Sequence, residues 1–463
     1  MRIKFTLVFV FILSMQRLSA QVETVLPFFR SMHQSSFFNP AFVPEYKTSI
    51  GLPVLDNIGL GTNINLTGFD LHLLVQSVDE NHILDYEKMF KSLDGPIGYN
   101  LSLKMDLLYA RFRVRSVYVG ISTGMRMSQS LGLGKELLGL PTADGLNALK
   151  ARPGENFDLL KMGVNLYTES AVSFTKEVGR LSFGFRVKVL NGIANIQTDQ
   201  VHFNIKSNTD TLEMQTSGSA HSSGAPIQAD SVDGHVSSNG DKNLQASDFT
   251  SFKNLGYGFD FGFTYQASMR LNVHGSVTDF GSFINWKNKT YNYDLSTVLF
   301  RFTGVSISQL NDTNQYFAHL QDSIFNIVKK SHVESSSSYK TTLPTRYYAG
   351  ADYDVTKSNR VGFLFQAIYY QGNVYPSYTI SYMHKFGRVW HLMANASKVD
   401  DMYKSYNTIG FGSLVKLGCV QFYIMQDNLV AFLDPSPSRT FTMTRIGFNL
   451  VFRALPRRKL VIR

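Results

Sequence analysis

The stretch from residue 256 to residue 286 restricts the possible folds more than any other part of the sequence, because its apolar residues recur with a period of two. In its first half, aromatic residues occupy every odd position: Tyr257, Phe259, Phe261, Phe263 and Tyr265. A turn over residues 266–270 leads into a second alternating run that starts at Leu271. Successive side chains of a strand point to opposite faces, so this pattern predicts a β-hairpin with one aromatic face.

Similar alternation recurs through most of the chain, between segments rich in glycine and polar residues. We assign strands to residues 58–66, 99–107, 117–127, 164–175, 181–195, 345–353, 361–369, 377–386, 389–397, 408–417, 420–425 and 442–453. With the hairpin, these runs predict an all-β fold: a transmembrane antiparallel β-barrel of roughly 14–16 strands with long extracellular loops and a few short helices. Closure of such a barrel removes the exposed edges of the sheet.

The composition of the chain agrees with a membrane barrel. Charged residues make up 17% of the sequence, below the value of about 25% that is typical of soluble domains, whereas aromatic residues reach 13%. The mean hydropathy is nevertheless close to zero, at −0.09. This combination arises when only half of the residues in each membrane strand face lipid.

Residues 1–20 have the pattern of a secretory signal peptide, with Arg2 and Lys4 before an apolar run and Ala20 at the expected cleavage site. The apolar run is too short to span a membrane as a helix, and we find no later run of about 18 apolar residues. Residues 21–463 are therefore expected to form one β-barrel. The predicted location is the outer membrane of a bacterial cell.

Several segments without strand periodicity are expected to lie outside the barrel wall. Residues 21–47 form a lead that contains proline and aromatic residues but has no clear period. Residues 82–93 and 309–330 have apolar residues at helical spacing, and we expect these helices to gate or plug the barrel. The remaining segments are long loops at about 129–161, 207–251 and 287–340, and a basic tail over residues 454–463.

No motif in the sequence favours an enzyme. Ser122 lies in a Gly-Ile-Ser-Thr-Gly run, but the hydrolase elbow needs a sharp turn from strand to helix and Ser122 lies within a predicted strand. The single cysteine, Cys419, excludes an internal disulfide framework. His202, His221 and His235 lack the tight spacing of metal ligands. We therefore predict no catalytic residue, no cofactor and no metal.

Charge provides candidates for the barrel interior rather than for nucleic-acid binding. The formal net charge of +10 falls to about +7 without the signal peptide, and no basic stripe is interleaved with aromatic residues. The charged side chains on polar strand faces that we expect to face the lumen are Arg186, Lys188, Asp260 and Arg445. Asp279 falls at a predicted strand end, which favours a place at the membrane interface. A register shift of one residue would exchange the two faces.

Seven segments, spread over nearly the whole mature chain, carry a resemblance to a known family. They are SSFFNPAFVPEYKTSIGLPV, FRVKVLNGIANI, GYGFDFGFTY, VTDFGSFINW, LPTRYYAGADY, TIGFGSLVKLGCVQFYIMQDN and TRIGFNLVF. Through them the chain resembles the uncharacterised outer-membrane β-barrel proteins of the Bacteroidetes, a domain-of-unknown-function group. It is more distantly similar to the type IX secretion system membrane protein family. The resemblance implies an outer-membrane barrel and brings no catalytic residues.

Two main functions remain open at this point, beside a third hypothesis of a barrel enzyme of the lipid-hydrolase kind, which predicts that Ser122→Ala abolishes a lipase signal. The first is a porin-like pore or transport protein for an unknown solute. The alternative is a non-conducting structural or scaffold subunit of an envelope or type IX secretion assembly, whose loops and basic tail bind other proteins. The expected partners are outer-membrane lipid and, under the second hypothesis, envelope or secretion-system proteins. Ion conductance in a planar bilayer would distinguish the two functions.

Overall fold

The structure is a computed structural model of the chain. It describes residues 23–51, 57–66, 97–134, 136, 151–152, 155–207, 212–224, 227–229, 236–238, 251–296, 299–302, 332–335, 337–370, 372–400, 405–429 and 440–454. The expected signal peptide, the expected helices at 82–93 and 309–330, and the tail beyond Ala454 lie outside the described residues.

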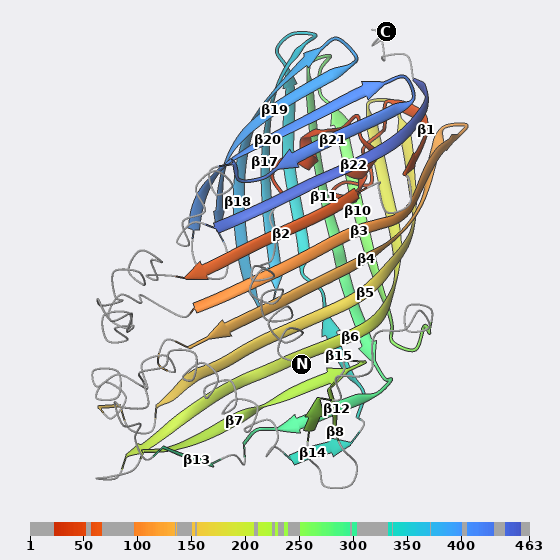
Figure 1. Ribbon diagram of the computed structural model, residues 1–463. Coiled ribbons are helices and arrows are strands. Elements are labelled where there is room, and N and C mark those ends of the chain that lie inside the picture. Colours follow the sequence, from red (N-terminus) through yellow and green to blue (C-terminus); the bar gives the residue numbers. More distant parts are fainter. Residues whose placement is uncertain are drawn as a thin grey trace, which may run out of the picture.

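The described strands form a closed antiparallel β-barrel with fourteen positions in its wall (Figure 1). This number lies within the range predicted from the sequence. Two of these positions are each shared by two short strands, the first by β1 and β2 and the other by β15 and β16. In order around the barrel, the wall contains β1 (Tyr46–Gly51), β2 (Asn57–Leu66), β3 (Ile97–Val114), β4 (Val117–Leu133), β5 (Asn156–Val178), β6 (Leu181–Ser207), β10 (Leu255–Gln266), β11 (Leu271–Trp286), β15 (Tyr339–Thr342), β16 (Thr345–Asp354), β17 (Asn359–Tyr370), β18 (Asn373–Phe386), β19 (Trp390–Asp400), β20 (Ser405–Leu417), β21 (Val420–Gln426) and β22 (Thr440–Ala454).

The last strand closes the barrel against the first two. Ile50 of β1 lies opposite Leu450 of β22 and also opposite Ala110 of β3, so β1 sits between these two strands. The strand β2 continues the same wall position, again between β22 and β3. Figure 1 shows blue β22 beside red β2 at this seam. Backbone groups along the ring are thereby paired between neighbouring strands, as they must be in a barrel that spans lipid.

The two ends of the barrel differ in the length of their connections. At one end, six pairs of successive strands are joined by no more than four residues each: β3–β4, β5–β6, β10–β11, β16–β17, β18–β19 and β20–β21. Gly179, Gly387 and Gly418 lie in three of these turns with φ of 60°, 65° and 61°, a conformation in which glycine carries no steric penalty. We call this end the short-turn end. Most connections at the opposite end are longer.

Side chains of the wall alternate between an apolar exterior and a largely polar interior. The five aromatic residues predicted to share a face of β10 are 37–46% exposed, from Tyr257 to Tyr265. On the return strand β11, Val273 is 37% exposed, whereas His274 and Thr278 are 4% and 3% exposed. The predicted hairpin is therefore confirmed, with its aromatic face directed outward.

Strands also occur in the segments predicted as loops. The additional strands are β7 (Leu212–Ser223), β8 (Ile227–Ala229), β9 (Val236–Ser238), β12 (Thr290–Asp294), β13 (Leu299–Phe302) and β14 (His332–Ser335). The strand β7 pairs with the distal part of β6 and also with β12 and β13, so it extends the sheet past the barrel. The expected loop at 129–161 is likewise shorter, because β4 reaches Leu133 and β5 starts at Asn156. One face of β7 begins with Leu212 and Met214 but continues with small residues, so its periodicity was too weak to reveal the strand.

Residues 23–45 lie inside the barrel, and we call this segment the plug (Figure 1). It contains two short 3-10 helices, η1 (Leu26–Phe28) and η2 (His33–Phe37). Six of its apolar residues belong to one buried cluster: Val25, Leu26, Phe28, Phe29, Met32 and Phe38. They pack against inward-facing residues of β16 to β21: Tyr348, Leu364, Met383, Met393, Leu414, Tyr423 and Met425. One side of the interior is therefore a dry core that holds the plug.

Glycine residues of the wall make room for the plug. A Cβ added to Gly184 would lie 2.1 Å from the carbonyl carbon of Pro40, and one added to Gly262 would lie 2.0 Å from Oδ1 of Asn39. A Cβ at Gly412 would lie 2.6 Å from the ring of Phe29. Contacts this short are not possible between real atoms, so a larger residue at any of these positions is incompatible with the docked plug as long as the plug residue that it faces is unchanged.

We predict that Gly184→Val lowers the stability of the protein by about 1–3 kcal/mol, because the new side chain overlaps plug backbone that cannot move aside cheaply. The urea midpoint of unfolding measures this loss. The matched control is Ala396→Val, since Ala396 is exposed on the outside of β19 and has room for the added methyl groups. Equal midpoints for the two variants would contradict the docked position of the plug.

Candidate functional site

Residues that the structure describes line two cavities, which lie on different sides of the plug along the barrel axis. The first has a volume of about 190 Å³ and is lined by Glu23, Phe37 and Phe38 of the plug and by wall residues toward the long connections; we call it the charged cavity. The second, about 970 Å³, opens at the short-turn end beside Pro44 and Glu45 of the plug, and we call it the vestibule.

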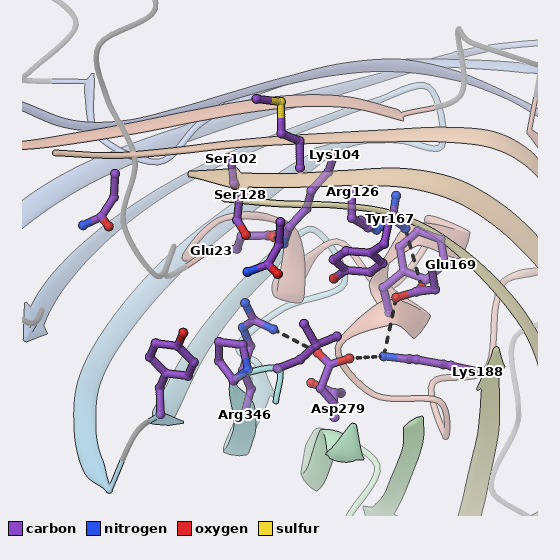
Figure 2. A pocket seen from close by; sticks show the side chains of 18 of the residues that line it. Glu23, Ser102, Lys104, Arg126, Ser128, Tyr167, Glu169, Lys188, Asp279 and Arg346 are labelled. Carbon is purple, nitrogen blue, oxygen red and sulfur yellow. Dashed lines mark hydrogen bonds and ion pairs between the residues drawn. The ribbon is translucent and has the colours of Figure 1, made fainter. Parts of the chain in front are cut away.

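Lys188 is the centre of an ion-pair network in the wall of the charged cavity (Figure 2). Its Nζ lies 2.8 Å from Asp260 Oδ1, 2.7 Å from Asp279 Oδ1 and 4.0 Å from Glu169 Oε2. Asp279 also binds Nη1 of Arg346 at 2.9 Å. These side chains come from β5, β6, β10, β11 and β16, so the network ties together strands that are distant in sequence.

A bulge in the hairpin places Asp279 in this network. The register between β10 and β11 shifts between Phe259 and Phe261, and Asp279 has a φ of 57°. Its backbone NH donates to Oδ1 of Asp260 at 2.8 Å. The expectation that Asp279 lies at a strand end near the interface is therefore wrong, because strict alternation cannot anticipate the extra residue of a bulge.

Arg186 links the network to the plug. Its Nη2 donates to the Ser122 hydroxyl at 2.7 Å and lies 3.5 Å from Glu169 Oε1, while its guanidinium lies 4.5 Å from the ring centre of Phe37. Cation–π contacts of this kind stabilise by about 0.5–2 kcal/mol. Ser122 lies in the middle of β4 and accepts this hydrogen bond from Arg186 of β6. It is therefore not at the sharp turn from strand to helix that a hydrolase elbow requires.

Glu23 of the plug forms a second ion-pair group in the same cavity. Its Oε2 lies 2.6 Å from Nη2 of Arg445, and its Oε1 binds the ammonium of Lys104. Lys104 and Arg445 lie on opposite sides of the same β2 residue, Gly59, so they converge on the carboxylate. Burial raises the pKa of Glu23, but the charges of Arg445 and Lys104 outweigh burial and hold the pKa at about 2. Glu23 is therefore ionised at neutral pH.

The four residues expected in the lumen divide between these two groups. Arg186, Lys188 and Asp260 lie together, and Arg445 lies with Glu23; all four are at most 4% exposed. That they line a path for solute stays a prediction. Sequence reasoning missed Glu169 and Arg346, although alternation in their strands was visible. It had no signal for Glu23, which lies in a segment without periodicity.

Further polar contacts fasten the plug to the wall. Oδ1 of Asp427 accepts hydrogen bonds from the backbone NH groups of Thr24 and Val25, both at 2.7 Å, and from the Thr24 hydroxyl at 2.9 Å. Asn39 Nδ2 donates to the carbonyl oxygens of Phe263 and Gly275, each at 3.1 Å. Such bonds stabilise by about 1 kcal/mol each, so the plug is held by many modest contacts.

The vestibule is strongly basic. Its lining contains nine arginine and lysine residues: Arg30, Arg113, Arg180, Arg270, Lys357, Arg360, Lys385, Arg388 and Lys416. Three acidic residues accompany them: Glu45, Glu177 and Asp354. Asp354 pairs with Arg360 at 2.7 Å, and Glu177 lies 3.7 Å from Arg113. The surplus of positive charge makes the short-turn end attractive to anions.

The described part of the chain contains no group of three or more His, Cys, Asp or Glu residues arranged to hold a metal ion. His202 pairs with Asp158 at 2.9 Å and His221 with Asp199 at 3.0 Å, in separate places. His235 lies outside the described residues. No helix in the described ranges is both long and apolar enough to cross a membrane.

Closed wall, charged interior and internal plug together define a plugged β-barrel. Within that class, the chain belongs to DUF5723, a family of unknown function, whose sequence model matches residues 40–427. The resemblance to a family of unknown function is thus confirmed. The relation to Bacteroidetes and to type IX secretion proteins stays a prediction. No protein of curated function matches the sequence.

The solved structures to which the chain is similar include monoaromatic hydrocarbon channels, toluene transporters and porins. The Pseudomonas putida toluene transporter TodX shares 9% identity, with 94% of this chain and 98% of that chain aligned and a TM-score of 0.42. The Ralstonia pickettii toluene transporter TbuX shares 9% identity over 90% of this chain and 94% of that chain, with a TM-score of 0.42. A mutant of the Rh. blastica porin shares 8% identity over 88% and 100%, with a TM-score of 0.25.

Removal of the Lys188 charge is predicted to destabilise the barrel by about 3–5 kcal/mol, because Lys188→Met leaves Asp260 and Asp279 buried without their shared cation. Urea unfolding of the refolded protein measures the loss. Lys176→Met is the control, since Lys176 is exposed at the end of β5. If both variants unfold at the same urea concentration, the network does not support the wall.

Acid is predicted to weaken the hold of Glu23. Its pKa is about 2 in the docked plug and 4.5 without partners, so its pairing stabilises the protein fully above about pH 4.5 and is lost as the pH falls toward 2. The contribution is about 3 kcal/mol. The difference in melting temperature between the parent and Glu23→Gln should be constant above pH 5 and shrink toward pH 2. The exposed Glu155→Gln serves as control, and a difference that grows in acid would refute the pairing.

Proposed function

We propose that this protein is an outer-membrane β-barrel that transports a solute through its interior, and that the plug moves to open the path. The observation that carries the proposal is the placement of two cavities on either side of a plug that is fastened by polar contacts.

The exterior of the wall supports a place in a membrane. Exposed apolar residues cover strands around the barrel, including Phe261 at 46%, Phe363 at 45% and Ile380 at 62%. A soluble protein rarely exposes a continuous apolar surface of this extent. Near the short-turn end, Tyr353, Phe386 and Trp390 are 40–48% exposed and match an aromatic girdle at a membrane–water interface.

The connections support an orientation in the outer membrane. Barrels of this membrane have short turns on the periplasmic side and longer loops on the extracellular side. The vestibule and the chain connection from the plug into β1 would then face the periplasm. The charged cavity would lie on the extracellular side of the plug.

The plug divides the two cavities and is built so that it can leave as a unit. Within the described residues, the plug is connected to the wall at one end, where it leads into β1. It contains no strand that belongs to the wall. Its apolar core contacts β16 to β21, and its contacts to Asp427 and Asn449 are hydrogen bonds that water can replace when the plug moves. Movement of the plug would join the charged cavity to the vestibule.

A disulfide lock tests this function. A Cβ at residue 262 would lie 2.9 Å from Cγ of Asn39, so Asn39→Cys with Gly262→Cys places one sulfur beside the opposite Cβ, as a disulfide requires. The exposed Cys419 is first replaced by Ser. Conductance in a planar bilayer is predicted to be silent in the oxidised protein and to appear in bursts after reduction.

The Asn39→Cys protein with Gly262 retained serves as the control, because it cannot form the bond and adds no Cβ at residue 262. Equal conductance before and after reduction of the double variant would show that the plug does not gate the path. A folded, reduced protein that never conducts or releases solute from vesicles would refute transport and favour the scaffold alternative.

A further inference from the structure

Four of the short turns each hold a cationic side chain that lines the vestibule: Arg180 between β5 and β6, Arg270 between β10 and β11, Lys357 between β16 and β17, and Arg388 between β18 and β19. These hairpins are neighbours in the wall, because β6 pairs with β10, β11 with β16 and β17 with β18. The four cations therefore follow one another along part of the vestibule mouth. We call them the turn arc.

The cations of the turn arc have no acidic partner. Less exposed cations of the vestibule are paired, since Arg30 binds Asp352. Arg360 likewise binds Asp354 at 2.7 Å. In contrast, all four side chains of the turn arc are exposed, and none forms an ion pair or a side-chain hydrogen bond with a residue that the structure describes. Their positive potential is open to an anion from outside the barrel.

The turn arc faces the vestibule and not the lipid around the barrel. Arg388 lines the vestibule, whereas Phe386 and Trp390, on either side of the same turn, are 48% and 40% exposed and belong to the aromatic girdle. Their ring centres lie 4.9 Å apart. All four cations of the arc come from the wall, so the arc stays in place wherever the plug lies. It is therefore a surface for a partner in water.

The spacing of the turn arc fits an extended partner. Neighbouring strands lie about 4.8 Å apart, so successive hairpins are about 10 Å apart. An extended or polyproline-like chain advances about 3.1–3.4 Å per residue, so about three residues span the step between two cations. Acidic residues at every third position of a segment of about ten residues would each meet one cation. A compact anion reaches only one or two of the four.

An apolar side chain in the arc favours a polypeptide over a chain of phosphates. Met269 directly precedes Arg270, lines the vestibule and is 65% exposed. Methionine and arginine are both enriched in protein interfaces relative to the rest of the surface. The flexible thioether of Met269 can pack against apolar side chains, which a polypeptide carries and a polyphosphate lacks.

We propose that the turn arc is a docking surface for an extended acidic segment of a water-soluble protein on the short-turn side of the membrane. The carboxylates of the segment pair with the four turn cations, and its backbone crosses the vestibule mouth. Docking needs no movement of the plug. Only the periplasmic location of the partner rests on the proposed function and its orientation.

Two fluorescent peptides of the same composition, with blocked ends, test the spacing. The spaced peptide repeats Asp-Pro-Pro four times, because the polyproline conformation places its acids about 9 Å apart on one side. The clustered peptide carries the same four aspartates in succession before the prolines. Fluorescence anisotropy with the full-length protein in neutral detergent micelles measures both affinities. The spaced peptide is predicted to bind about threefold to tenfold more tightly.

Removal of the turn cations identifies the surface. The turn variant combines Arg180→Gln, Arg270→Gln, Lys357→Gln and Arg388→Gln. The matched control changes four exposed lysines near the long connections, which do not line the vestibule: Lys253→Gln, Lys287→Gln, Lys289→Gln and Lys398→Gln. All eight side chains are exposed, so both variants are expected to fold, and the net charge falls equally in the two. Only the turn variant is predicted to lose affinity for the spaced peptide, by about tenfold or more.

Three outcomes would overturn the docking surface. Equal affinity for the spaced and the clustered peptide contradicts an extended partner. An equal loss of affinity in the turn variant and its control shows a response to net charge alone. A parent protein without preference between the peptides that retains more phosphatidylglycerol than the turn variant uses these cations for lipid headgroups.

Failure of the docking surface is separable from failure of the transport function. If the spaced peptide does not bind while the disulfide lock still controls conductance, the partner is wrong and transport stands. If the spaced peptide binds through the turn cations but the protein never conducts, the docking surface is supported and the transport function is wrong.

Discussion

The need to neutralise charge inside a closed wall governs this structure. The barrel places its apolar residues outside, so its polar residues converge on a confined interior where each charge must find a partner. Lys188 meets this need with three wall acids, whereas Arg445 and Lys104 meet it with Glu23 of the plug. The same constraint that stabilises the wall thus makes part of the wall depend on the plug.

The wall was largely predictable because one physical rule, the period of two, acts on every strand. Tyr257 to Tyr265 defined a strand and its outward face from the sequence alone. The rule failed wherever a strand departs from strict alternation of apolar and polar residues. Asp279 is turned inward by a bulge, and the face of β7 that begins with Leu212 and Met214 continues with small residues, so neither leaves a clear mark in the alternation.

The plug was not predictable by the same reasoning. Its residues 23–45 are rich in aromatic side chains but follow no period, because they pack into an irregular space rather than onto a regular sheet. The sequence holds an indirect trace of it in Gly184, Gly262 and Gly412, which occupy inward positions where a barrel otherwise carries polar side chains. Only the folded wall shows that these glycines face one segment.

The position of the plug directly before β1 also sets the order of folding. Thr24 bonds to Asp427 across 403 residues of sequence, and β1 pairs with β22, the last strand. Contacts between such distant parts of a chain form late, since the loop between them must close first. The plug can therefore dock only when the C-terminal strand has arrived, and every newly made barrel passes through an unplugged stage during its assembly.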